Sequence, residues 1–174
     1  MRLISCLLSL TLLFASPFGL ARSIPSPEQS QAPGNEALQT PIRLANYSPL
    51  VNYQLQCQGC HLAQGEGAPG DGVPRMTGFV GNFLKVEGGR EFLIQVPGAA
   101  LSALTNQQLA GLLNWMLEKD EIAAGSAPKS FTRYNEKEVA QHRGVMLQDL
   151  VGHRRALVEK IQDLGIQIPK GADI

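Results

Sequence analysis

The chain has 174 residues with 15 basic and 15 acidic side chains, so its formal net charge at pH 7 is zero. This balance gives no electrostatic basis for binding nucleic acid, whose phosphates are contacted by an excess of Lys and Arg. The length suits one modest domain with appended segments.

The first 21 residues have the pattern of a secretory signal. Met1 and Arg2 form a short positive start, residues 3–14 form an apolar run, and small residues lead to Ala21. We expect a signal peptide at 1–21, cleaved near Ala21, and a periplasmic location. A membrane anchor is the weaker alternative, because the apolar run is shorter than the roughly 18 to 20 residues that cross a bilayer. No membrane span is expected after cleavage.

Residues 22–45 are rich in Pro, Ser, Gln and Asn and show no hydrophobic period. This composition predicts a flexible linker over 22–45. The folded part is predicted to start at Ser48 and Pro49, since serine caps helices and proline suits a first helical turn. A short helix should therefore lead into residue 57.

Residues 57–61 read Cys-Gln-Gly-Cys-His, the spacing of a c-type haem attachment site. Cys57 and Cys60 can form thioethers with the two vinyl groups of one porphyrin, and His61 can bind its iron. A Cys-x-x-Cys pair can also be a disulfide or a redox dithiol, but the dithiol predicts a strand-helix-strand context that the Gly- and Leu-rich flanks do not support. Zinc is weaker still, because His142 and His153 lie far along the chain.

The segment after the motif predicts a loop and then three helices. Residues 63–72 are glycine-rich and should form the loop. Short helices are predicted at 76–86 and 90–96. Thr105 and Gln108 form a capping box that starts a helix ending near Glu118.

A polar break over 120–129 precedes a last predicted element. Asn135 and Glu138 can cap a long helix that reaches about Leu164. Apolar residues recur along it at helical spacing, so one face must be buried. We expect this helix to fold back on the preceding domain. The alternative is that the C-terminal helix is a docking element for a partner.

Residues 48–119 resemble the class I monohaem cytochrome c family, in the motif, the glycine-rich loop, Val73-Pro74 and a closing helix that ends in Asn-Trp-Met-Leu. The resemblance implies an all-α fold, with a haem domain at 46–119 and a helical C-terminal extension at 120–174. It implies one covalently bound haem c per chain, held by Cys57 and Cys60. His61 would be the proximal ligand, and the Pro74 carbonyl would accept a hydrogen bond from its other ring nitrogen.

By the same resemblance the protein is an electron carrier and not an enzyme. Its partners would be a redox donor and a redox acceptor, with a periplasmic dehydrogenase as a candidate.

The sequence departs from the family at the sixth iron ligand. Family members place a methionine before the closing helix, but residues 96–103 contain no Met, His or Lys. Met76 is the first candidate for the distal ligand and Met116 the second, while His142 or His153 could serve only if the last helix covers the haem. A vacant position would favour the alternative function, a haem-based binder or sensor of small ligands.

Overall fold

The computed structural model describes residues 41–174, which lie within one compact unit, Leu38–Ile174. The predicted signal peptide and residues 22–40 of the predicted linker lie outside this range. The described helices and 3-10 helices are α1 (Pro41–Leu44), α2 (Pro49–Gln56), α3 (Gln58–His61), η1 (Pro69–Asp71), η2 (Val80–Lys85), α4 (Gly89–Gln95), α5 (Pro97–Ala100), α6 (Asn106–Glu118), α7 (Glu136–Arg143) and α8 (Leu150–Asp163).

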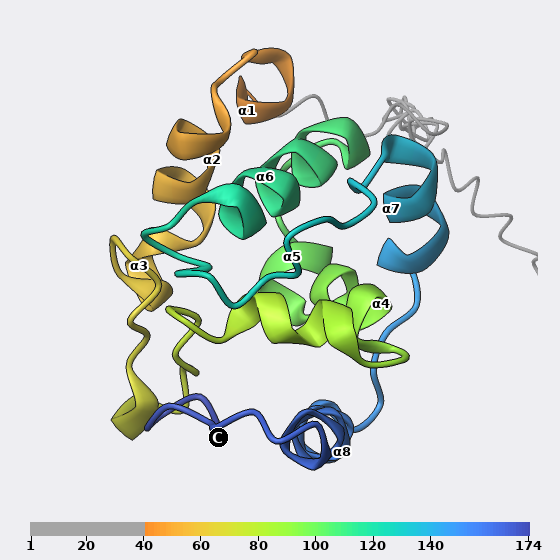
Figure 1. The fold of residues 1–174 in the computed structure, drawn as a ribbon. Coiled ribbons are helices and arrows are strands. Elements are labelled where there is room, and N and C mark those ends of the chain that lie inside the picture. The colour runs from red at the N-terminus through yellow and green to blue at the C-terminus, as the bar shows by residue number, and fades with distance from the viewer. Residues whose placement is uncertain (1–40) are drawn as a thin grey trace, which may run out of the picture. The chain divides into compact units, whose positions relative to one another are not determined.

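The fold is all-α, as the sequence predicts. Within residues 41–174 the only β feature is an isolated bridge between Ala68 and Val73. Helix α6 packs against α2 on one side and α7 on the other, and α4 packs against η2, α5 and α7 (Figure 1). None of the helices from residue 41 onward is long and apolar enough to cross a membrane.

Helix α6 begins at the predicted capping box. The Thr105 hydroxyl accepts a hydrogen bond from the Gln108 N–H at 3.1 Å, and the Gln108 side-chain oxygen accepts one from the Thr105 N–H at 2.8 Å. These bonds satisfy backbone donors that a helix start otherwise leaves free.

The end of the predicted linker is ordered, so the expectation of a flexible linker is wrong for residues 41–45. The Gln108 amide donates to the carbonyls of Ile42 and Ala45, both at 3.1 Å, and the Arg43 Nε donates to the Ala103 carbonyl at 3.1 Å. The side chain that caps α6 thus also holds α1, a long-range link that local composition does not show.

The prediction of a single long C-terminal helix is also wrong, because the segment forms two helices, α7 and α8. Asn135 caps α7 as expected, and α7 ends at Gly144. Helix α8 has its own cap, in which the Asp149 carboxylate accepts the Gly152 N–H at 2.8 Å. The chain turns between the end of α7 at Gly144 and the start of α8 at Asp149, and this turn lets α8 return to the domain.

The predicted fold-back of the C-terminal segment is confirmed, since α8 packs against η2. Leu157, Val158 and Ile161 of α8 are buried in the common core. Residues 165–174 then run back to the η1 loop, where the Arg75 N–H donates to the Gly171 carbonyl at 2.8 Å (Figure 1). The extension is therefore part of the same body as the predicted haem domain.

Candidate functional site

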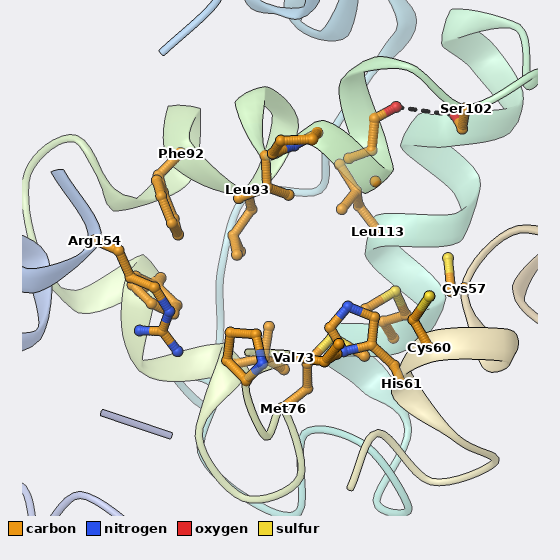
Figure 2. Close-up of a pocket in the computed structure, with 18 of the residues that line it drawn as sticks. Cys57, Cys60, His61, Val73, Met76, Phe92, Leu93, Ser102, Leu113 and Arg154 are labelled. Carbon is orange, nitrogen blue, oxygen red and sulfur yellow. Dashed lines mark hydrogen bonds between the residues drawn. The ribbon is translucent and has the colours of Figure 1, made fainter. Parts of the chain in front are cut away.

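The motif at 57–61 lies at one end of an apolar cavity of about 470 Å³ (Figure 2). Its lining comes from the end of α2, the motif, the 72–76 loop, η2, α4 to α6, and α8 with the terminal segment. The volume falls within the roughly 300–1,000 Å³ of pockets that enclose a cofactor. Cavity and motif therefore form one candidate site.

A tight turn presents the three chemical groups of the motif together. Cys57 ends α2 and starts α3, and its carbonyl accepts the N–H groups of Cys60 at 3.2 Å and His61 at 2.9 Å. The Tyr53 hydroxyl donates to the Leu62 carbonyl at 2.7 Å, which ties the end of the turn to α2. Both cysteines are free thiols, and they line the cavity together with His61.

The thiol chemistry does not suit a redox dithiol. Burial, reinforced by the neighbouring Cys60, raises the pKa of Cys57 to about 11. Reactive Cys-x-x-Cys sites need a lowered pKa, because the thiolate is the nucleophile. The motif also lacks the strand-helix-strand context of that class, since no strand is assigned within residues 41–174. In the same range, no group of three or more His, Cys, Asp or Glu side chains could hold a metal ion.

His61 has an unpartnered nitrogen. Its Nδ1 is buried and has no hydrogen-bond partner among the described residues. Burial lowers the pKa of His61, and the nearby Pro74 carbonyl partly offsets this. The Pro74 carbonyl is thus close enough to influence the pKa of the ring, but it does not form a hydrogen bond with Nδ1. The predicted hydrogen bond from His61 to Pro74 therefore stays a prediction.

The Pro74 carbonyl packs directly against Gly67, and this packing requires a residue without a Cβ at position 67. Gly67 has a φ of 68°, and a Cβ at this position would lie 2.5 Å from the Pro74 carbonyl oxygen. Glycine at this position of the loop thus allows the backbone of Pro74 to lie close to His61, the residue proposed to bind the iron.

These groups fit a c-type haem. Two free thiols and a neutral imidazole adjoin an apolar cavity of suitable size. The buried Nδ1 of His61 also has no hydrogen-bond partner among the described residues, which is unusual for a buried polar atom.

Comparison with known proteins points the same way. Two curated relatives, both cytochrome c-552 from Thermus thermophilus, are 31% identical to the chain over 124 residues. The match covers 59% of this chain and 91% and 80% of the two relatives. No family model and no solved structure matches the chain.

The chain belongs to the class I monohaem cytochrome c family. Membership implies a covalently bound haem c and a role in electron transport, and not in enzymatic catalysis.

The wall opposite His61 in this cytochrome offers no strong iron ligand. Figure 2 shows Phe92, Leu93, Ser102 and Leu113 across the cavity from the imidazole. The Ser102 hydroxyl is already engaged, because it donates to the Ala99 carbonyl at 2.9 Å.

The two candidate methionines both line the cavity but differ in position. Met76 lies beside His61 (Figure 2), and its methyl group would lie 3.4 Å from a Cβ on Gly65. Met116 is on α6 and is buried in the core. The structure thus brings Met76 to the site, but on the histidine side.

The tail histidines do not reach the cavity, although α8 folds back as their candidacy required. The His153 ring stacks on Phe92 with centroids 5.8 Å apart, and neither His153 nor His142 lines the cavity.

The charged side chain that α8 does bring to the cavity is that of Arg154. Sequence reasoning missed it. The available signal was its spacing, four residues after Leu150 and three before Leu157, which puts a charged residue inside the apolar stripe.

Proposed function

We propose that this chain is an exported, periplasmic cytochrome that carries one electron at a time on a single haem c. Each motif thiol would add across the double bond of a haem vinyl group, with its sulfur bonding one vinyl carbon and its hydrogen going to the other. His61 would bind the iron from one side, with its ring oriented by the Pro74 carbonyl. The haem supplies a one-electron redox centre, and the protein supplies its attachment, burial and orientation.

The observation that carries the proposal is the placement of Cys57, Cys60 and His61 on one turn at the end of the cavity. A redox partner could approach the haem edge here. Cys60 is exposed, and Leu55 and Leu62, which flank the motif, are 55% and 47% exposed. An apolar rim of this kind suits docking without strong charge steering. We propose a periplasmic dehydrogenase as the electron donor.

For the distal ligand we retain Met76 first and Met116 second. Because Met76 lies beside His61, its ligation requires the loop around it to move. Gly72 and Gly78, with φ of 78° and 71°, flank this loop and supply the freedom it needs.

The test is the absorption spectrum of the full chain, produced with a haem-attachment system. A carrier is expected to be low-spin in both oxidation states and to exchange electrons with a donor without binding carbon monoxide. A five-coordinate reduced form that binds carbon monoxide readily would contradict the carrier role.

The apolar wall opposite His61 favours a second candidate function, a binder or sensor of small neutral ligands. The same spectra decide between the two, because a vacant position is open to carbon monoxide whereas a thioether ligand competes with it.

A further inference from the structure

Arg154 is a buried charged residue with an incomplete set of partners. Its side chain lines the cavity, and the residue is only 8% exposed. One terminal nitrogen, Nη2, donates to the Ala172 carbonyl at 2.8 Å. The other, Nη1, is buried and has no hydrogen-bond partner among the described residues.

The surroundings do not compensate the charge fully. Burial lowers the pKa of Arg154 to about 10, and Asp173 opposes this only through its field. No carboxylate of residues 41–174 lies within 4.0 Å of the guanidinium. The Phe83 ring, 5.5 Å from the guanidinium carbon, gives a partial cation–π contact. A buried cation of this kind requires an anion.

The position of Arg154 in the cavity indicates which anion. Figure 2 shows Arg154 at the side of the cavity opposite Cys57 and Cys60. In a haem the vinyl groups and the propionates occupy opposite edges of the porphyrin. A haem attached at the two cysteines therefore directs its carboxylates toward the far end of the cavity.

We propose that Arg154 binds a haem propionate and so makes the C-terminal extension part of the haem site. This inference rests on the proposed function, since it needs the haem that the motif would attach. A guanidinium suits the role because its planar fork bonds a carboxylate while Nη2 keeps its bond to Ala172. The simpler alternative is that Arg154 only fastens the terminal segment, but that role leaves Nη1 without a partner.

Charge at this end of the cavity sets the expected pH behaviour. The Arg154 cation lowers the pKa of the propionate, so the pair stays ionised and neutral overall across pH 5–9. In R154Q the propionate pKa rises, and its ionisation on going to higher pH places an uncompensated negative charge near the iron. Negative charge stabilises the oxidised state, so the potential falls. Arg75 lines the same cavity as Arg154, and Asp173 acts on the Arg154 charge through its field. The elements packed beside α8 also carry charged residues, Lys85 on η2 and Arg90 and Glu91 on α4, and His153 precedes Arg154 on α8 itself.

The experiment compares the reduction potentials of the wild-type holoprotein, R154Q, R154K and R155Q from pH 5 to pH 9. Arg155 is the matched control, because it lies on the same helix but is exposed and does not line the cavity. R154Q is expected to match the wild type near pH 5 and to fall below it at pH 8. R154K, which keeps the charge, should stay near the wild type, and R155Q should match it throughout.

An R154Q protein with the wild-type potential across this range would overturn the inference, even if its thermal stability is lower. Should R154Q fail to fold, the propionate deformation band in the resonance Raman spectrum decides. The inference expects a shifted band in R154K and an unshifted one in R155K, and an unshifted band in R154K overturns it. A wild-type chain without attached haem would instead overturn the proposed function beneath it.

Discussion

Asn114 of α6 and Tyr134 of the C-terminal extension exchange two hydrogen bonds. The Asn114 amide nitrogen donates to the Tyr134 carbonyl at 3.0 Å, and its oxygen accepts the Tyr134 N–H at 2.8 Å. Asn114 is buried, so the pair joins the extension to the central helix where water does not compete.

Replacement of Asn114 by alanine should lower the free energy of unfolding by about 1–3 kcal/mol, because it leaves the Tyr134 N–H and carbonyl buried and unpaired. Chemical denaturation of the holoprotein measures this. Asn46 is exposed, so N46A serves as the control and should change stability by less than about 0.5 kcal/mol. Equal stability of N114A and the wild type would show that the extension is not fastened here.

Two glycines should respond to alanine in opposite directions. A Cβ on Gly81 would lie 2.2 Å from the Ala127 backbone nitrogen, so G81A must displace backbone and should destabilise the protein. Gly111, within α6, has nothing within 4 Å of its Cβ position, so G111A should stabilise the protein by roughly 0.5–1 kcal/mol. Thermal unfolding of both variants checks the pair. A stable G81A protein would contradict the close packing of η2 against Ala127.

Truncation after Gln148 should expose the haem without detaching it. It removes α8 and the terminal segment, and with them the cavity-lining side chains of Leu150, Val151, Arg154 and Ile174. The attached haem becomes more accessible to water, so the reduction potential should fall and carbon monoxide should bind faster. Potentiometry and flash photolysis measure these changes. An unchanged potential together with unchanged stability would show that the tail is dispensable.

Alanine substitutions of the two candidate distal methionines should have different effects on the absorption spectrum and on stability. M116A removes a core side chain and should cost about 2–5 kcal/mol while leaving the low-spin spectrum intact. M76A should lose the low-spin spectrum, because Met76 is the first candidate for the iron ligand. If both single variants keep a low-spin wild-type spectrum, neither thioether is the ligand and another group binds the iron, whereas a five-coordinate reduced wild type would support the small-ligand function.

Local signals in the sequence were sufficient to predict several features. The caps at Thr105 and Asn135 and the return of the last helix follow from nearby residues or from periodicity, while the all-α class follows from the family resemblance. The family is confirmed by the Thermus relatives.

The errors have long-range causes. The order of residues 41–45 depends on Gln108, more than 60 positions away, and the break between α7 and α8 depends on a second cap at Asp149. Arg154 was missed because apolar periodicity gives no weight to a charged residue on a buried face.

The most direct test of the account is the mass of the denatured full-length protein after production with a haem-attachment system. The account predicts a chain heavier by one haem, a mass that C57A/C60A loses while an exposed control such as Q107A keeps it. It also predicts that H61A retains the added mass but loses the wild-type spectrum, because attachment and ligation use different residues. A wild-type chain with no added haem mass would contradict the central claim.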